Sequence, residues 1–440
     1  MKIAPFLTTI VTFTAGGSAL GQSRQIPAPP QMRPAIIFRA TLHPITAPSI
    51  ERGWVVFEGG RITDLGSGDP PDVPGAERFR AQGLHVYPGL IGTDTTLGLV
   101  ETQSVRVTVD YTEFGRITPE TRAVVAINPD SDLIPVARAN GILTAMVMPR
   151  GGLVAGRSST IRLDGWTWAD MSIDPEAGLV IGWPRTVSPS RWRRPSQSEE
   201  EQKKQLKEDL ESIERLFDDA EAYFRSRRSN PNQAADLRYE AMRDAISSNK
   251  PVFVRASARG QIESAVAWAV RRGLLIVIVG GEEAAEVIPL LRRHDVAVIV
   301  GGVHRLPRRR DDPYDSRYTL PATLHEAGIR FAIASGSSAA HERTLSHNAA
   351  TAVAFGLPKE RALEALTISA ARIIGLGTTH GSIEVGKAAT MIVTTGDPLQ
   401  ITTDTLLAFI DGRRIDLGNR HKSLYEKYRE KYRQLGIITD

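Results

Sequence analysis

The chain has 440 residues, of which 41% are hydrophobic and 24% charged, a composition typical of a folded protein. A formal net charge of only +4 and the absence of cysteine exclude a strongly polybasic protein, disulfides, thiolate metal ligands and cysteine nucleophiles. Two arginine clusters, Arg191–Arg194 and Arg308–Arg310, belong to no recognisable nucleic-acid-binding module. We interpret them as solvated surface and expect no nucleic-acid partner.

The first residues have the pattern of an export signal. Lys2 supplies a positive start, an uncharged and mostly apolar run extends from Ile3 to Thr14, and Ala19 and Gly21 suit a cleavage site before Gln22. The sequence therefore predicts a signal peptide over residues 1–21 and a periplasmic or secreted mature protein. The alternative is a frayed N-terminal helix or strand. No other run approaches the ~20 apolar residues that span a bilayer, so we expect no transmembrane segment.

A Pro-rich linker over residues 22–34 leads into short strands and turns over residues 35–86. Similar short strands and turns return over residues 379–416. There the apolar run Met391–Val393 is followed by a second run, Leu406–Ile410, which ends at the turn Asp411-Gly412-Arg413. These two β-rich flanks predict one small composite β-sandwich domain built from both ends of the chain. A helical tail is expected over residues 417–440.

Between the flanks, over residues 87–378, short apolar runs alternate with helical patterns. The runs read as strands covered on both faces: Ile142–Met148, Val252–Ala256, Leu275–Val279, Val296–Val300 and Ile329–Ala334. The helical patterns are Gln261–Arg272, Ala284–Arg293 and Thr319–Ala327. Such alternation predicts parallel βαβ units, in either a barrel or an open doubly wound sheet. Fewer than eight clear strands can be counted, so periodicity alone leaves both open.

One segment of this middle region is different. Over residues 196–228 the sequence is strongly charged, and apolar residues recur at alternating spacings of four and three. This predicts a long helix with a narrow apolar stripe. The stripe packs either on the chain's own barrel or on a partner. Packing on the barrel is the interpretation we favour.

Four further segments point to a known family. Tyr87 to Gly98, with the sequence YPGLIGTDTTLG, resembles the entry to the first barrel strand of amidohydrolases. The segments Ala352–Leu357, Ala365–Leu376 and Gly381–Ala389 resemble the C-terminal part of that superfamily, and most of all its imidazolonepropionase-like branch. The resemblance implies an α/β fold, a (β/α)8 TIM-like barrel with the composite β-sandwich, and metal-assisted hydrolysis of non-peptide C–N bonds such as those of cyclic amides or amidines.

The resemblance also implies where metal ligands should stand, and this chain departs from the pattern at each position. The family's His-x-His pair falls on Asp94 and Thr96, two middle-strand histidines fall on Arg255 and Gly280, and the late aspartate falls on Gly336. Arginine and glycine side chains do not bind metals, and threonine does so poorly. We therefore expect no metal cofactor and no metal-dependent hydrolysis.

Other polar residues follow predicted strands and complete the set of pocket candidates. Ser257 lies two residues after Arg255, His304 follows Val296–Val300, and Ser335 follows Ile329–Ala334. Ser335 lacks the flanking glycines of a nucleophile elbow. His341 is the other histidine after a strand end, and a new metal site built from Asp94, His304 and His341 is a minor alternative.

Two functions remain open from the sequence. The chain either binds a small polar ligand at the barrel mouth without catalysis, or acts as a subunit of a homo- or hetero-oligomer, in both cases as a pseudoenzyme. Alternatively, it hydrolyses a C–N bond without metal, using Asp94 or His304. In either case the unshielded charge of Arg255 needs a carboxylate. We predict an ion pair with Asp94 or another acid in the pocket.

Overall fold

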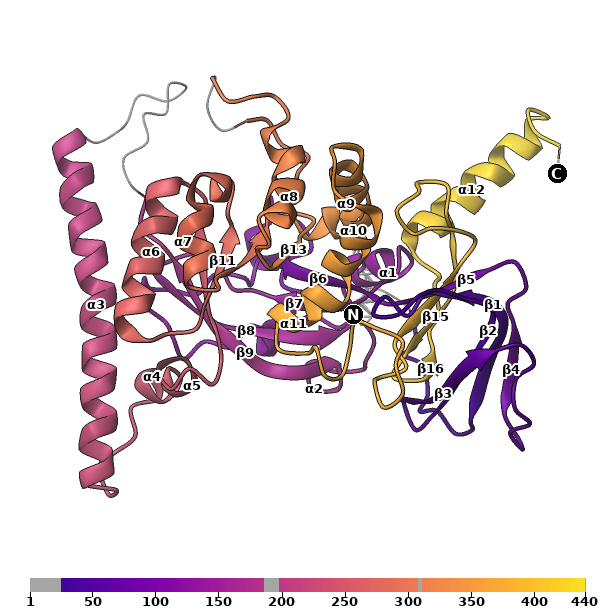
Figure 1. Cartoon of the computed structure of the whole chain (residues 1–440), viewed down its shortest axis with the longest axis horizontal. Coiled ribbons are helices and arrows are strands. Elements are labelled where there is room, and N and C mark those ends of the chain that lie inside the picture. Colours follow the sequence, from indigo (N-terminus) through magenta and orange to yellow (C-terminus); the bar gives the residue numbers. More distant parts are fainter. Residues whose placement is uncertain (1–24, 186–197, 308–310, 337, 440) are drawn as a thin grey trace, which may run out of the picture.

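Two eight-stranded sheets organise the chain, one in the middle and one at its ends (Figure 1). The computed structural model describes residues 25–185, 198–307, 311–336 and 338–439. The predicted signal peptide and both arginine clusters lie outside these ranges. The (β/α)8 TIM-like barrel and the composite second sheet expected from the sequence are both confirmed.

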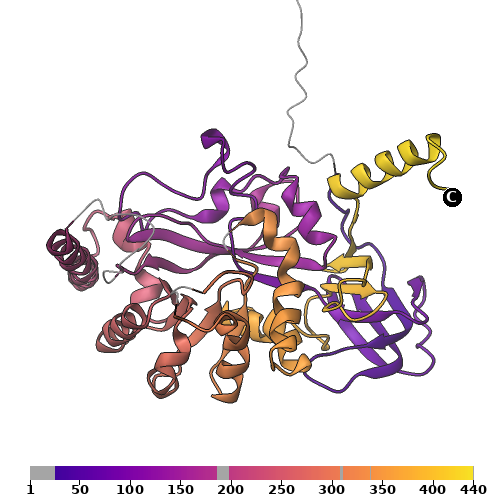
Figure 2. The same cartoon turned by 90° about the horizontal axis from the view of Figure 1, so that it is seen from above.

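The first sheet curls into a nearly closed barrel, seen from above in Figure 2. Its strands run in the order β13-β12-β11-β10-β9-β8-β7-β6. Their bounds are β6 (Leu90–Thr95), β7 (Ile142–Val147), β8 (Val154–Arg162), β9 (Ser172–Gly182), β10 (Val252–Ala256), β11 (Ile276–Gly280), β12 (Ala297–Val300) and β13 (Phe331–Ile333). Most side chains of β7, β11 and β12 are fully buried, as expected for strands covered on both faces.

Strand β8 departs from the regular barrel pattern, because it runs antiparallel to both β7 and β9. Only residues 148–153 connect β7 to β8, whereas a parallel crossover needs a dozen or more residues. The chain therefore turns back directly. All other pairings in this sheet are parallel among the described strands.

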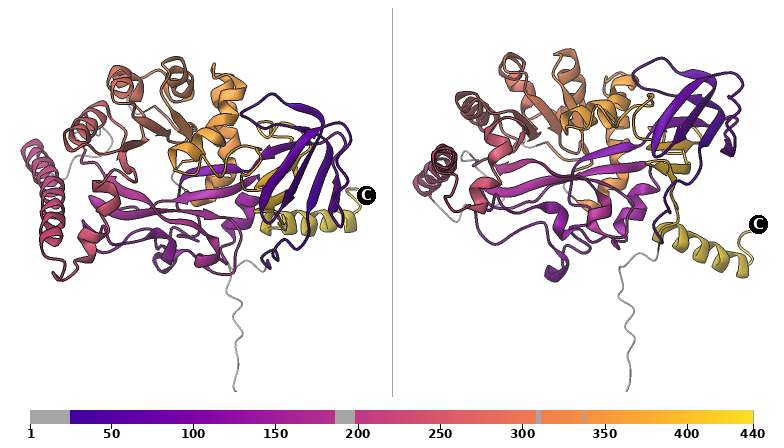
Figure 3. Two further views of the ribbon diagram at one scale, coloured as in Figure 1. Left: turned by 60° about the horizontal axis from the view of Figure 1, so that its bottom comes forward. Right: turned by 90° about the horizontal axis from the view of Figure 1, so that it is seen from below.

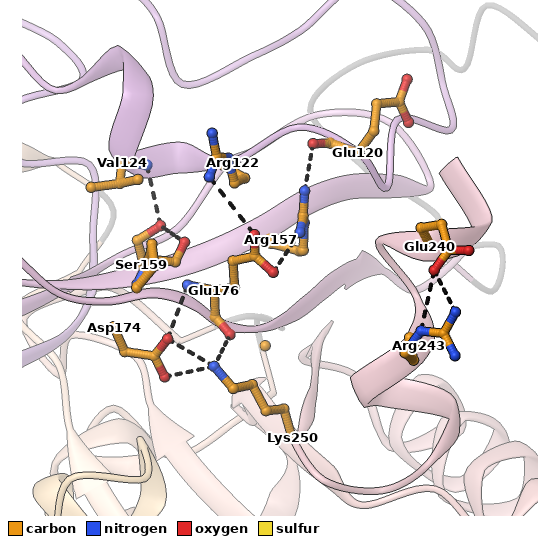
Figure 4. Close-up of polar contacts among 12 residues, drawn as sticks. Glu120, Arg122, Val124, Arg157, Ser159, Asp174, Glu176, Glu240, Arg243 and Lys250 are labelled. Atoms are coloured by element: carbon orange, nitrogen blue, oxygen red, sulfur yellow. Dashed lines mark hydrogen bonds and ion pairs between the residues drawn. The ribbon is translucent and has the colours of Figure 1, made fainter. Parts of the chain in front are cut away.

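Ion pairs fasten this antiparallel section to its surroundings (Figure 4). Lys250, just before β10, binds both oxygens of Asp174 on β9 at 2.7 and 2.8 Å. Glu176 on β9 pairs with Arg157 on β8 at 2.6 Å and with Arg122 at 3.8 Å. These contacts link β8, β9 and the start of β10, which holds β10 in place for the site described below.

Helices cover the outside of the barrel (Figure 1). They are α1 (Leu133–Arg138), α2 (Trp168–Met171), α4 (Leu237–Glu240), α5 (Arg243–Ile246), α6 (Arg259–Arg272), α7 (Ile288–Arg293), α8 (Ser316–Glu326), α9 (Leu345–Ala354), α10 (Lys359–Leu366) and α11 (Ile368–Ile373). Short 3-10 helices are η1 (Arg106–Thr108), η2 (Ala123–Ala126), η3 (Ala284–Val287) and η4 (Ala339–Thr344). The predicted helix over 284–293 is thus divided into η3 and α7, with Pro289 in the first turn of α7.

Helix α3 (Glu199–Ser229) is the long charged helix that the sequence predicts. It begins with a capping box in which Ser198 and Glu201 exchange hydrogen bonds, and its first turn is acidic. Its stripe is buried at Ile213 and Phe217, and the ring of Phe217 meets that of Trp268 on α6 edge-on at 4.9 Å. The stripe therefore packs on the chain's own barrel.

The second sheet joins the two ends of the chain. Its strands are β1 (Ala35–Leu42), β2 (Ile50–Glu58), β3 (Arg61–Ser67), β4 (Glu77–Arg80), β5 (His85–Pro88), β14 (Met391–Thr394), β15 (Thr405–Ile410) and β16 (Arg413–Arg414). Strands β5 and β14 pair antiparallel, so the early and late strands lie side by side in both views of Figure 3. Phe57 and Phe79 both contact Phe409 edge-on at 5.1 Å, so residues from both ends share one core.

The last helix, α12 (Arg420–Gln434), has no buried residue and projects from the body of the molecule (Figure 1). It confirms a helix in the predicted tail. In the described part of the chain, no helix is both long and apolar enough to cross a membrane.

Candidate functional site at the barrel mouth

The carboxyl ends of the barrel strands bring Asp94 and Arg255 together. Asp94 is the penultimate residue of β6, and Arg255 is the penultimate residue of β10. Nη2 of Arg255 donates to Oδ1 of Asp94 at 2.7 Å, and Nη1 donates to Oδ2 at 3.1 Å. This two-bond geometry confirms the predicted ion pair, and it is the strongest form of guanidinium–carboxylate contact.

A second arginine shares the same carboxylate. Nη2 of Arg150 lies 3.4 Å from Oδ1 of Asp94, and only 19% of the Arg150 side chain and 9% of the Asp94 side chain are exposed. Burial alone would raise the pKa of Asp94, but the guanidinium groups of Arg255 and Arg150 outweigh burial and hold that pKa below its ordinary value. Asp94 is therefore ionised and forms ion pairs with two guanidinium groups.

These residues line a cavity of about 830 Å³ at the barrel mouth. Its charged lining, among the described residues, comprises Arg116, Arg150, Arg185, Arg255, Arg305, Asp94, Asp209 and Glu282. Arginines thus outnumber acids by five to three. Asp209 on α3 pairs with Arg116 at 2.7 Å, while Glu282 pairs with Arg317, which lies outside this lining, at 2.9 Å. The cavity is positively charged.

The other sequence candidates divide between this cavity and its surroundings. Ser257 lines the large cavity, whereas Thr96 is buried and is not among the residues that line it. Gly280 and Gly336, at two expected ligand positions, also line the cavity and have positive φ angles of 102° and 112°. A Cβ at Gly280 would lie 2.8 Å from Oγ of Ser257, so the local packing also favours glycine there.

A smaller cavity of about 270 Å³ adjoins the first and contains the predicted histidines. His304, Ser335 and His341 line it, and it shares Gly302, Arg305 and Gly336 with the larger cavity. Nε2 of His304 lies 2.7 Å from Oγ1 of Thr351 on α9. Burial and nearby His347 lower the pKa of His304. The structure thus places His304 and His341 in this neighbouring cavity, and Asp94 in the larger one.

Sequence reasoning did not identify Glu342, although it lies close enough to Asp94 for that charge to raise its pKa. This residue of η4 is 1% exposed, and Oγ of Ser335 donates to its Oε2 at 2.7 Å. Burial raises the pKa of Glu342 to about 7 and the charge of Asp94 adds to this, against the opposing effect of hydrogen bonds from Ser335 and Thr95. A side chain at Gly92 would collide with the Glu342 carboxyl group, so a glycine in β6 leaves the space for it.

The divalent metal implied by the sequence resemblance does not fit these residues. Both oxygens of Asp94 accept hydrogen bonds from guanidinium groups, and two other expected ligand positions are glycines. A metal ion bound to Asp94 would have to sit among permanent cations. Among the described residues, no cluster of three or more histidine, aspartate or glutamate side chains is placed to hold a metal ion.

Comparison with known proteins agrees with this fold. The model of the amidohydrolase family matches residues 187–416. Over 101 residues the chain is 36% identical to imidazolonepropionase of Acinetobacter baumannii, covering 22% of this chain and 23% of that protein. The chain thus matches only about a quarter of the length of this curated relative.

Solved structures match over much more of the chain. An amidohydrolase from Thermotoga maritima MSB8 superposes with a TM-score of 0.77 at 24% identity, covering 87% of this chain and 99% of that one. An adenosine deaminase from Xanthomonas campestris with bound zinc has a TM-score of 0.50 at 18% identity, covering 93% and 100%. At these identities the similarity concerns the fold.

Proposed function

Since this chain belongs to the amidohydrolase family, we propose that it is a metal-independent member that uses the family's barrel to bind a small polar ligand. The observation that carries this proposal is the two-bond contact between Arg255 and Asp94 at the barrel mouth. A guanidinium group occupies the region in which the family resemblance would require a metal ligand. A pseudoenzyme with a retained pocket follows from this exchange.

The alternative, metal-free hydrolysis, would need a base at the barrel mouth. Asp94 is a weak base, because Arg255 and Arg150 hold its pKa low. His304 already contacts Thr351, and its pKa is lowered too.

The hydroxyl group of Ser335 does contact the carboxyl group of Glu342 at 2.7 Å, but burial raises the pKa of Glu342 to about 7, so below that pH the carboxyl group holds its proton and cannot act as a base. Ligand binding without catalysis is therefore the function we propose.

We expect protein purified without added metal to contain well under one zinc, manganese or iron ion per chain. Its melting temperature should not change with a chelator, because an occupied tight site would contribute stability that the chelator removes. Elemental analysis and thermal unfolding, with and without chelator, measure both. A screen against cyclic amides, amidines and dipeptides should show no turnover.

The proposal would be contradicted if the wild-type protein contained a stoichiometric metal ion and the Asp94→Ala variant did not. The matched control is Asp397→Ala, which removes a carboxylate outside both barrel-mouth cavities. Metal content that falls equally in both variants would point to a site elsewhere, and would also contradict a metal-independent protein.

We also propose that the protein is exported, with residues 1–21 removed. The support is the charged start, the apolar run and the small residues before Gln22.

A further inference from the structure

The positive charge of the arginines at the barrel mouth exceeds the negative charge of the acids that pair with them there. Arg150 and Arg255 share one carboxylate, Asp94, so these three partly buried side chains together carry one excess positive charge. Arg305 also lies close enough to lower the pKa of Asp94 and that of Arg150. Buried excess charge is costly unless an opposite charge compensates it.

Glu342 supplies little of that compensation below about pH 7, because burial raises the pKa of its carboxyl group to about 7. Nor does Glu282, since Arg317 already binds it at 2.9 and 3.0 Å. The missing negative charge therefore has to come from solvent or from a ligand. A bound anion would be shielded from water by the cavity walls and held by planar guanidinium groups.

The shape of the site limits the kind of anion. The cavity of about 830 Å³ is within the range of small-molecule sites, and its neighbour of about 270 Å³ continues it past Gly302 and Gly336. The first part is rich in arginine, whereas the second contains the hydroxyl group of Ser335 and the ring of His304. A ligand spanning both would have an anionic end and a neutral polar end.

We infer that the barrel mouth binds a small organic carboxylate, with its anionic group on Arg150, Arg255 and Arg305 and its polar end toward Ser335 and His304. This inference rests on the proposed function, because the guanidinium groups take the place in which a metal would stand. The carboxylate suits the planar, forked donors of arginine better than a neutral amide, which offers one acceptor oxygen and no charge.

The test uses two matched pairs of probes on the full chain at low ionic strength. Glutarate and N-acetylglycine are the carboxylates, and glutaramide and N-acetylglycinamide are their neutral counterparts. Titration calorimetry should show saturable binding of at least one carboxylate with a dissociation constant of about 1 mM or tighter. The neutral counterpart should show none at the same concentration, and added salt should weaken the binding.

Two variants locate the site. Arg305→Gln removes an exposed cavity arginine, so the fold should persist while affinity for the carboxylate falls about tenfold or more. Arg330→Gln is the control, because Arg330 precedes β13 at the end of that strand opposite the mouth, and its affinity should equal that of the wild type. Asp94→Asn should change affinity in the opposite direction to Arg305→Gln, because it removes a competing negative charge.

Three results would overturn the inference. The first is equal behaviour of the carboxylates and their amides, and the second is equal loss of affinity in Arg305→Gln and Arg330→Gln. The third is tighter, Arg305-dependent binding of inorganic phosphate, which would assign the site to phosphate compounds. If metal analysis finds a stoichiometric ion removed by Asp94→Ala, the proposed function itself fails, whatever the calorimetry shows. Absence of metal with no carboxylate binding refutes this inference alone.

Discussion

Arg255 determines the chemistry of the barrel mouth because its charge cannot be removed by deprotonation. A histidine in a buried strand can remain neutral and lend its ring nitrogen to a metal, whereas an arginine requires an anion beside it. Asp94 meets that requirement with both oxygens, and Arg150 then adds a second cation to the same carboxylate. An arginine in place of a histidine at this one strand position thus changes which ligands the barrel mouth can bind.

Asp94→Ala should lower the free energy of unfolding by about 3 kcal/mol, because it leaves two partly buried guanidinium groups without their shared carboxylate. The double variant Asp94→Ala/Arg255→Met should recover part of that loss by removing one of the cations. Denaturant unfolding of the four proteins in this cycle measures the coupling. Glu263→Ala, which breaks an exposed pair on α6, should cost less than about 1 kcal/mol. A cost for Asp94→Ala as small as this control would refute a buried pair.

Glu342 should make stability depend on pH in a defined direction. Its pKa is about 7 in the folded protein, against about 4.3 for an unfolded glutamate, so the native state holds this proton more tightly. The stabilisation is complete below the unfolded pKa and is lost as pH rises through about 7. The free energy of unfolding of Glu342→Gln should therefore rise relative to that of the wild type between about pH 5 and 8, by on the order of 3 kcal/mol.

Thermal unfolding of both proteins across this pH range is the measurement. Glu286→Gln, an exposed position on η3, is the control and should track the wild type at every pH. A constant difference between Glu342→Gln and wild type would show that Glu342 does not titrate in this range.

The ion pair of Asp94 and Arg255 was predictable because carboxyl ends of parallel barrel strands meet at one face. The same rule could have indicated Arg150, which follows β7 by three positions. Glu342 could not be found in this way. It lies beyond β13 in a polar segment without periodicity, and its buried carboxyl group occupies space next to Gly92 that a side chain there would fill.

At the scale of elements, the sequence located the strands that consist of continuous apolar residues. Strand β10 has its predicted bounds, and β11 and β12 are within one residue of theirs. Strand β8 was not predicted, because its residues Ser158, Ser159 and Thr160 interrupt the apolar run, although all three are fully buried. Their hydroxyl groups have partners that only the fold provides. For example, Oγ of Ser159 accepts from the backbone N–H of Val124 and donates to the carbonyl of Pro175.

Helix α3 should contribute to the stability of the barrel as an integral element. Phe217→Ala removes a fully buried ring that meets Trp268, and we expect a loss of about 3–5 kcal/mol in unfolding free energy. Arg215→Ala, on the exposed face of the same helix, should change it by less than about 0.5 kcal/mol. Denaturant unfolding distinguishes the two. Equal, small effects would mean that α3 is only loosely attached and would favour a partner-binding role.

For the whole molecule, the export prediction concerns which residues remain in the mature protein. We expect N-terminal sequencing of protein recovered outside the cytoplasm to begin at or near Gln22. Replacing Ala19 with a bulky residue should slow processing, because the small side chain suits the cleavage site, whereas Ala28→Leu lies beyond that site and should not. Cytoplasmic protein that retains Met1 would contradict the prediction.

The composite sheet has a consequence for how the chain is made. Strands β1 to β5 leave the ribosome first, but the outer edge of β5 finds its neighbour β14 only after the entire barrel has been synthesised. Until then the nascent chain carries an open strand edge and an incomplete hydrophobic core. Such distant pairing slows folding and prolongs the exposure of that edge. A message cut short before Met391 would therefore yield a protein prone to edge-to-edge aggregation, even with every barrel strand present.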